Sequence, residues 1–355
     1  MLSLHAVPLP MALKEHRFRS RVGDRECRDL SYTIFVTAPS LHPDGVAILQ
    51  EAGCRLIFLD KGADEADVDS IMAGNPVDAI ISRTVNLSAK AIADCPTLKV
   101  ISKHGVGVSN IDVEAASARG IPVFVTPGAN AQSVAEMALG LLLAGARRIS
   151  WMDAELKAGR WSRAQDGLEL SGKTLGLIGF GQIGQKLARA CLAIGMKVQA
   201  FDPGIGMASP VEGVTMIASP AEMLPSSNVL SLHVPLNAHT RGMIDAAALA
   251  ALPDKAILIN TARGEVVDEA ALISALESGK LYSAGLDTTA EEPISPDSPL
   301  LKLPNVVLTP HVGGSTPAAL AGMATGAARN VLGFLSGNTP PVSACVNPIT
   351  LESKE

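Results

Sequence analysis

From residue 31 onward, the sequence alternates between short apolar runs and stretches with helical spacing. Apolar runs bounded by Gly and Pro and separated by helices are typical of parallel strands covered on both faces. The runs fall into two series, so we predict an α/β protein with two doubly wound parallel-sheet domains. The predicted strands are residues 32–37, 55–59, 79–82, 100–103 and 123–126 in the first series, and 174–180, 197–202, 214–217, 229–234, 256–261, 283–287 and 306–309 in the second.

The order of the predicted elements indicates how the two domains divide the chain. An Ala- and Leu-rich helix is predicted at residues 131–148, after the first series of strands. The last predicted helix, residues 317–335, has no strands of its own, so we expect it to return to the first domain. The first domain then comprises residues 31–127 and 313–348, and a second domain, residues 128–312, is inserted in it.

Composition and charge exclude several classes of protein. The 355 residues are 47% hydrophobic and 18% charged, which is enough apolar material for two cores. A net charge of −6 argues against a nucleic-acid partner, and no apolar run is long enough to predict a membrane span. Five scattered cysteines without a CxxC pattern predict reduced thiols in a cytoplasmic protein and no metal site. Residues 1–30 mix Arg, Asp and Glu without periodicity, and we interpret them as an N-terminal extension.

A glycine motif predicts a dinucleotide site at the start of the second series. Gly179, Gly181 and Gly184 form G-x-G-x-x-G between a predicted strand and a predicted helix. Gly179 permits the tight turn, Gly181 lets the backbone approach a pyrophosphate, and Gly184 lets helix and sheet pack closely. The phosphates would then lie against free N–H groups at the positive end of the helix dipole.

Asp202 indicates which dinucleotide this site prefers. It lies 18 residues past Gly184, at the end of the next predicted strand. A carboxylate there accepts hydrogen bonds from both ribose hydroxyls and repels a 2′-phosphate, and neither Pro203 nor Gly204 supplies a compensating cation. We therefore expect NAD rather than NADP. The alternative is a structural glycine turn beside a solvated Asp.

Three charged or titratable residues follow successive strands of the second series. They are Arg263, Glu292 and His311. Each alone is more often a cap or an ion-pair partner than a catalytic group. Together, at the edge where α/β sheets bind ligands, they supply what oxidation of a 2-hydroxy acid needs. One group binds the carboxylate and polarises the carbonyl, a second moves the hydroxyl proton, and a carboxylate orients the second.

Six separate motifs between residues 31 and 348 resemble the D-isomer-specific 2-hydroxyacid dehydrogenase family. Besides the glycine motif they are the segments at 233–240, 260–264, 292–293 and 309–316, together with segment 126–136, which resembles the D-3-phosphoglycerate dehydrogenases most closely. The resemblance implies an oxidoreductase with a Rossmann NAD-binding domain inserted in a flavodoxin-like substrate domain. It also implies a homodimer, which we expect to form on the apolar helix 131–148.

The same resemblance assigns roles by position. Arg263 would bind the substrate carboxylate and carbonyl, His311 would be the general acid/base, and Glu292 would be its partner. The implied cofactor-binding residues are Gly179, Gly181, Gln182, Ile183, Gly184, Asp202, His233, Val234, Pro235, Thr261, Ala262, Arg263, Asp287, His311, Gly313 and Gly314. The implied substrate-binding residues are Arg83, Lys103, Gly105, Val106, Gly107 and Arg263.

Two departures from the phosphoglycerate enzymes leave the substrate open. Where those enzymes usually carry Arg-Ala-Gly-Thr-Gly-Val-Asp-Asn, this chain has Lys-His-Gly-Val-Gly-Val-Ser-Asn at residues 103–110. Many of them also carry C-terminal regulatory modules, and with few residues after Pro348 we expect no serine feedback inhibition through such a module.

The first expectation for the substrate pair is 3-phosphoglycerate and 3-phosphohydroxypyruvate, in serine biosynthesis. The alternatives are a hydroxypyruvate or glyoxylate reductase or another D-2-hydroxyacid dehydrogenase and, more remotely, an NAD-sensing corepressor. A formate dehydrogenase is disfavoured, because those enzymes have Gln at the position of Glu292.

Overall fold

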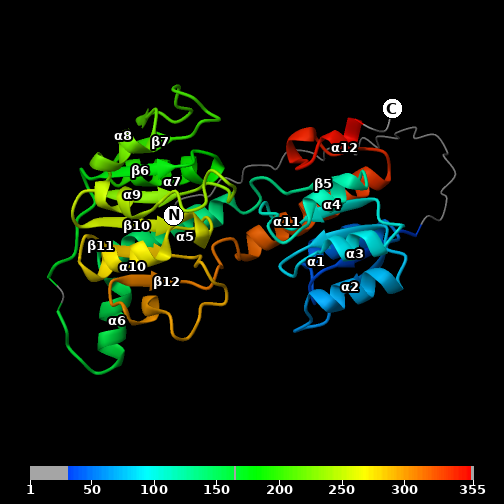
Figure 1. The fold of residues 1–355 in the computed structure, drawn as a ribbon, viewed down its shortest axis with the longest axis horizontal. Coiled ribbons are helices and arrows are strands. Elements are labelled where there is room, and N and C mark those ends of the chain that lie inside the picture. Colours follow the sequence, from blue (N-terminus) through cyan, green and yellow to red (C-terminus); the bar gives the residue numbers. More distant parts are fainter. Residues whose placement is uncertain (1–30, 164, 353–355) are drawn as a thin grey trace, which may run out of the picture.

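The computed structural model describes residues 31–163 and 165–352, and the expectation for residues 1–30 lies outside this part of the chain. Two parallel sheets form the two lobes seen in Figure 1. The first sheet has the order β2-β1-β3-β4-β5, which is the flavodoxin-like order. Its strands are β1 (Thr33–Val36), β2 (Arg55–Phe58), β3 (Ala79–Ser82), β4 (Val100–Lys103) and β5 (Val123–Phe124).

A helix from the C-terminal part of the chain completes the first lobe. Helix α11 (Pro317–Leu335) packs against strands β3 and β4 and shares a buried cluster with Ile34 and Val36. Its approach to α1 is close, because a Cβ added at Gly45 would lie 2.8 Å from the Cβ of Ala324. The exact domain boundaries stay predictions. The other helices of this lobe are α1 (Pro43–Glu51), α2 (Glu65–Gly74), α3 (Ala89–Asp94), α4 (Val113–Ala118) and α12 (Ile349–Glu352).

The second sheet has the order β12-β11-β10-β9-β6-β7-β8, so the strand order reverses between β6 and β9. This is the Rossmann arrangement, and the prediction of two doubly wound parallel sheets is confirmed. The strands are β6 (Thr174–Ile178), β7 (Lys197–Phe201), β8 (Val214–Met216), β9 (Val229–Leu232), β10 (Ala256–Asn260), β11 (Leu281–Leu286) and β12 (Val306–Leu308). The α-helices that connect them are α7 (Gln182–Ala193), α8 (Pro220–Met223), α9 (Ala246–Ala251) and α10 (Glu269–Glu277), and short 3-10 helices occur at Leu224–Ser226, Gly264–Val266, Pro299–Lys302 and Val342–Ala344.

The helix predicted at 131–148 is shorter than expected. Helix α5 (Ala131–Ala146) ends because Arg148 adopts a left-handed conformation, with φ of 52°, and a separate helix α6 (Ile149–Lys157) follows. The apolar side chains of α5, including Leu141 and Leu142, are buried in the core of the second lobe. Packing within one subunit therefore accounts for the apolar composition of α5, and that composition is no argument for a dimer.

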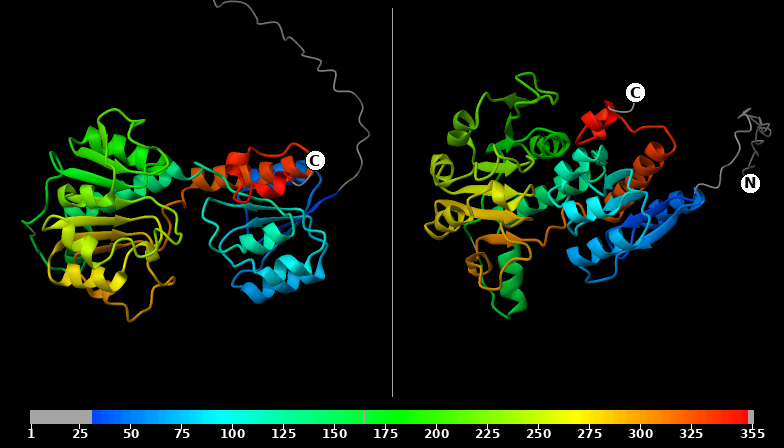
Figure 2. Two further views of the ribbon diagram at one scale, coloured as in Figure 1. Left: turned by 45° about the horizontal axis from the view of Figure 1, so that its top comes forward. Right: turned by 45° about the vertical axis from the view of Figure 1, so that its right-hand side comes forward.

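The chain passes from one lobe to the other twice, between β5 and α5 and between β12 and α11 (Figure 2). A hydrogen bond of 2.6 Å links Ser133 on α5 to Thr316, the N-cap of α11. Within the described part of the chain, no helix is both long and apolar enough to cross a membrane.

Candidate active site and dinucleotide site

The strands of the second sheet end in one row. The final residues of six neighbouring strands pair with one another across the sheet, in the order Phe201, Ile178, Leu232, Asn260, Leu286 and Leu308. The residues that follow therefore share one edge, which we call the carboxyl edge. Nearly all the predicted residues of the second domain lie along it or in the loops that leave it, which is where open parallel sheets bind ligands.

Two of the three motif glycines are required by the protein's own packing. Gly179 has a φ of 91°, and a Cβ there would lie 2.3 Å from the carbonyl oxygen of His233. A Cβ at Gly184 would lie 2.5 Å from the carbonyl oxygen of Gly179. At Gly181 a Cβ would meet no described atom within 4 Å. The open space at Gly181 fits a ligand that approaches the backbone there, as a pyrophosphate does.

The start of helix α7 offers free backbone donors at the same place. Its N-cap, Gly181, has no side chain to accept from the first N–H groups, and Gln182 and Ile183 are the first residues of the helix. Unpaired N–H groups and the positive end of the helix dipole together suit a phosphate anion. The glycine loop and the helix start thus fit a dinucleotide.

Asp202 is held beside the glycine loop by two backbone hydrogen bonds. One carboxylate oxygen accepts from the N–H of Phe180 at 2.8 Å, and the other accepts from the N–H of Gly204 at 2.9 Å. Each oxygen keeps a second lone pair for a further donor, such as a ribose hydroxyl. Asp202 therefore both fixes the loop and presents negative charge where the ribose of a dinucleotide would lie.

The loop after β9 contributes His233, Val234 and Pro235 to the same edge. The Nε2 of His233 lies 2.9 Å from the Oγ of Ser231, and burial lowers the pKa of His233 to about 4, so the ring is neutral at pH 7. Its Nδ1 and the Oγ1 of Thr261 are buried and have no hydrogen-bond partner among the described residues. Such groups are costly to leave unpaired, and a bound ligand could satisfy them.

Asp287 fixes the loop that carries His311. Its Oδ1 accepts from the Oγ1 of Thr309 at 2.6 Å and from the N–H of Val312 at 2.9 Å, and its Oδ2 accepts from the N–H of Gly313 at 2.8 Å. A side chain at position 313 would collide with that carboxylate, since a Cβ there would lie 2.8 Å from Oδ2. The buried Asp287 thus defines the course of the His311 loop.

His311 and Glu292 form a hydrogen-bonded pair at the carboxyl edge. The Nδ1 of His311 lies 2.7 Å from the Oε2 of Glu292, and the Oε1 of Glu292 accepts from the N–H of Thr289 at 3.2 Å. The two side chains keep 44% and 39% of their surfaces exposed, so a small molecule can reach them. Because Nδ1 faces the carboxylate, Nε2 is the nitrogen that remains for a substrate.

Arg263 lies where the two lobes meet. Its Nη1 donates to the carbonyl oxygen of Ala262 at 2.6 Å, and a Cβ at Gly107 would lie only 1.8 Å from its Nη2. Asn260 fixes this turn, since its Oδ1 accepts from the N–H of Ala262 and its Nδ2 donates to the carbonyl oxygen of Arg263. The guanidinium of Arg263 therefore rests against the 105–107 loop of the first lobe.

The first lobe brings two more cations to this place. Arg83 follows β3, and Lys103, the last residue of β4, is 9% exposed. The Nζ of Lys103 donates to the carbonyl oxygen of Arg83 and to the Oδ1 of Asn110. In the same loop, the N–H of Gly105 donates to the Oγ1 of Thr126, and Val106 is 48% exposed.

Sequence reasoning did not single out Asn260 and Asn110. Asn260 is the last residue of β10 and Asn110 lies in the loop between β4 and α4, and each makes side-chain hydrogen bonds to the backbone of a segment that carries a cation. An Asn shortly before or after a candidate binding residue was the available signal. No group of three or more His, Cys, Asp or Glu side chains that could hold a metal occurs in the described residues.

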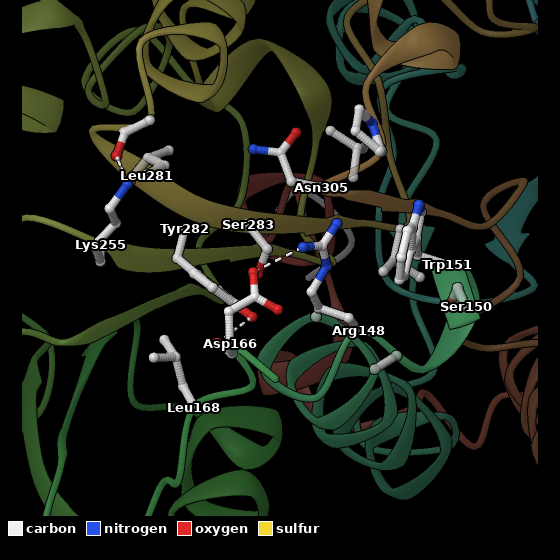
Figure 3. A pocket seen from close by; sticks show the side chains of 16 residues that line it. Arg148, Ser150, Trp151, Asp166, Leu168, Lys255, Leu281, Tyr282, Ser283 and Asn305 are labelled. Carbon is white, nitrogen blue, oxygen red and sulfur yellow. Dashed lines mark hydrogen bonds and ion pairs between the residues drawn. The ribbon is translucent and has the colours of Figure 1, made fainter. Parts of the chain in front are cut away.

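A cavity of about 410 Å³ lies at the opposite edge of the second sheet (Figure 3). It is lined by residues at or near the amino ends of the strands, such as Lys255 and Leu281, and by Arg148 and Trp151 from the start of α6. It is therefore not part of the carboxyl edge.

The fold and the site define a class. A Rossmann sheet whose glycine loop fits a dinucleotide, and whose carboxyl edge carries a His–Glu pair beside an Arg, is the arrangement of a dinucleotide-dependent oxidoreductase. The profile described as "D-isomer specific 2-hydroxyacid dehydrogenase, NAD binding domain" matches residues 139–313.

Comparison with known proteins defines the family. The chain is 44% identical to a hydroxypyruvate reductase of Thermotoga maritima over 267 residues, which are 74% of this chain and 86% of that protein. It is 40% identical to a D-3-phosphoglycerate dehydrogenase of Archaeoglobus fulgidus over 280 residues, which are 78% of this chain but 53% of that protein. The solved structure of the TT0316 protein from Thermus thermophilus superimposes with a TM-score of 0.81 at 36% identity, covering 88% of this chain and 99% of that one. The chain belongs to the D-isomer-specific 2-hydroxyacid dehydrogenase family, whose members are oxidoreductases with an NAD-binding domain.

Proposed function

We propose that this protein transfers hydride between NAD(H) and a D-2-hydroxy acid or its 2-oxo acid, with Arg263, Glu292 and His311 as its catalytic residues. The observation that carries the proposal is the 2.7 Å contact between His311 and Glu292 on the edge that also carries the glycine loop and Arg263. The nicotinamide supplies or accepts the hydride when it is bound. All other parts of the reaction fall to the chain's own residues.

Each of the three residues has a distinct task. Arg263 binds the substrate carboxylate, and its charge polarises the neighbouring carbonyl toward the negative oxygen that develops during reduction. The Nε2 of His311 donates a proton to that oxygen in reduction and accepts it back in oxidation. Glu292 holds Nδ1 so that Nε2 points to the substrate, and it stabilises the protonated ring. NADH is preferred over NADPH because of the charge on Asp202.

For the substrate, we propose 3-phosphohydroxypyruvate and 3-phosphoglycerate. In support, Arg83 and Lys103 add positive charge near Arg263, and no described acid forms an ion pair with any of the three. The relatives named above divide between a hydroxypyruvate reductase and a phosphoglycerate dehydrogenase, and the chain spans about half the length of the latter. Reduction of hydroxypyruvate or glyoxylate is the second candidate, favoured by the higher identity to the hydroxypyruvate reductase.

The test is kcat/KM for NADH oxidation with 3-phosphohydroxypyruvate, hydroxypyruvate, glyoxylate and 2-oxoglutarate. We expect kcat/KM for 3-phosphohydroxypyruvate to exceed that for glyoxylate by at least about tenfold, which corresponds to about 1.4 kcal/mol of added charge interaction. Higher values for hydroxypyruvate would replace the substrate proposal with the second candidate. Slow turnover of all four would favour the corepressor alternative and contradict the enzyme.

We further propose a homodimer formed on α6 rather than α5. None of the α6 residues is buried within the subunit, and Ile149, Leu156 and Trp161 are 52%, 53% and 77% exposed. Ser150 and Trp151 of the same helix line the cavity of Figure 3, so a second copy that packs on α6 would also cover this cavity. Light scattering should give twice the 36.7 kDa chain mass for the wild type and a lower mass for Trp161→Glu. A monomeric wild type at micromolar concentration would contradict the dimer.

The cytoplasmic location of the protein also stays a prediction.

A further inference from the structure

Three basic side chains gather where the two lobes meet, and within residues 31–163 and 165–352 none of them forms an ion pair with an acid. The described charged and titratable groups facing Lys103 are Arg83 from the end of β3, Arg263 from the end of β10, and the adjoining His104. Burial, together with Arg83 and Lys103, lowers the pKa of His104 to about 4, so His104 is neutral at pH 7. We call the set Arg83, Lys103 and Arg263 the cation cluster.

Lys103 differs from the other two members in being able to lose its charge. Burial, and then Arg263 and Arg83, lower its pKa to about 7, whereas an Arg keeps its proton at any pH of interest. Its two hydrogen-bond acceptors, the carbonyl of Arg83 and the amide oxygen of Asn110, carry no net charge to offset this.

The hydrogen bonds of Asn110 hold Lys103 in this position. The Nδ2 of Asn110 donates to the Oγ of Ser82 and to the carbonyl oxygens of Arg83 and Val85, which leaves its Oδ1 turned to Lys103. These hydrogen bonds and its burial hold the ammonium group within the cluster, away from full hydration.

We propose that Lys103 is a specificity-determining residue that takes up a proton when a substrate with a second acidic group binds, and releases it when that substrate leaves. The inference rests on the proposed function, because it assumes that Arg263 binds the first carboxylate. A second anion beside the cluster favours the charged form of Lys103. A monoacid, which Arg263 alone can neutralise, has little effect on it.

This linkage predicts how affinity depends on pH. With a pKa of about 7 in the free site, Lys103 is mostly charged at pH 6 and mostly neutral at pH 8. A diacid that requires the charged form should bind about tenfold more weakly at pH 8 than at pH 6, and it should take up about 0.9 proton at pH 8 and about 0.1 at pH 6. For a monoacid, replacing Lys103 should change neither the pH dependence of the affinity nor the number of protons taken up.

The experiment is titration calorimetry of the NADH-loaded protein with sulfoacetate, a dianion throughout this pH range, and with oxamate, a monoanion. Titrations at pH 6 and pH 8 in two buffers of different ionisation enthalpy give the number of protons taken up. The variants are Lys103→Arg, which is always charged, and Lys103→Met, which never is. The control is Lys99→Met, at an exposed lysine just before the same strand. Circular dichroism confirms that each variant is folded.

In the wild type and Lys99→Met, the change in sulfoacetate affinity between pH 6 and pH 8 should exceed that in Lys103→Arg by about tenfold, whereas the change in oxamate affinity should be the same in all three proteins. Lys103→Arg should also lack the part of the proton uptake that belongs to Lys103, even if Lys103→Met does not fold. Sulfoacetate binding whose pH dependence and proton uptake are the same in Lys103→Arg as in the wild type would overturn the inference, as would failure of sulfoacetate to bind. The proposed function fails separately, through absence of turnover in the 2-oxo acid assay.

Discussion

Replacing Asp202 tests whether this residue selects the cofactor. Its carboxylate accepts from the N–H groups of Phe180 and Gly204 and has lone pairs left for the ribose. In Asp202→Ala, loss of the charge-assisted hydrogen bonds to the ribose should weaken the binding of NADH by about 2 kcal/mol. A 2′-phosphate about 4 Å from Asp202 would be repelled by up to about 4 kcal/mol, which partial solvation reduces to about 1 kcal/mol.

These two effects change the preference in the same direction. Asp202→Ala should therefore shift the ratio of kcat/KM for NADH over NADPH by about 3 kcal/mol, or about two orders of magnitude, toward NADPH. The substitution also removes the hydrogen bond from the N–H of Phe180, which weakens the binding of both cofactors equally and so leaves the ratio of their kcat/KM values unchanged. A basic residue at Pro203 in the same chain should increase the shift.

The assay is steady-state oxidation of each cofactor at a saturating concentration of the best 2-oxo acid. Asp254→Ala is the control, because it removes the same charge from a side chain that is 87% exposed and paired with Lys280. A wild type that uses NADPH as well as NADH would refute the reasoning, and so would a ratio that Asp202→Ala leaves unchanged.

Three further variants test other parts of the account. Gly107→Ala should displace the Arg263 guanidinium and lower kcat/KM about 10²-fold with the dissociation constant of NADH unchanged, as measured by fluorescence titration. Glu292→Gln removes the carboxylate that holds the Nδ1 of His311 and should lower kcat about tenfold in both directions with the dissociation constant of NADH unchanged; a wild-type kcat would contradict the pair. Asn347→Ala leaves a buried N–H of β5 unpaired and should lower the free energy of unfolding by about 2 kcal/mol in urea titrations.

The fold could be predicted because each strand is a separate apolar run. All twelve predicted strands exist, but most end one or two residues early. The reason is visible at Asp202 and His233, which stand at the end of their predicted runs but leave the sheet to bind the glycine loop or to line the edge. An apolar run in the sequence indicates which residues are buried but not which of them pair in a sheet. The residues at these strand ends are partly buried without being paired, so the predicted strands are too long.

The break between α5 and α6 could not be predicted from local sequence. Neither Arg147 nor Arg148 is a helix breaker, and the left-handed conformation of Arg148 depends on tertiary contacts. Its guanidinium pairs with Asp166 at 2.8 Å and lies over the ring of Trp151. A single turn of this kind separates the buried helix from the exposed one.

The candidate site was predicted residue by residue, with Glu292 as the partner of His311, but its other connections were not. Glu292 lies in the loop after β11 and His311 in the loop after β12, and only the folded structure brings their side chains to 2.7 Å. Asp287 fixes the His311 loop through three hydrogen bonds between these same two segments. The cation cluster joins β3, β4 and β10, which belong to two different sheets. Sequence motifs name such residues but give no distance between them.

The central claim is that His311 moves the proton in an NADH-dependent reduction. The most direct measurement is the single-turnover rate of NADH oxidation by His311→Ala, with the best 2-oxo acid saturating and the dissociation constant of NADH measured in parallel. We predict a rate about 10²–10⁴-fold below wild type with the NADH dissociation constant unchanged, and a wild-type rate for the control His42→Ala, at the N-cap of α1. A His311→Ala rate within about threefold of wild type would contradict the account.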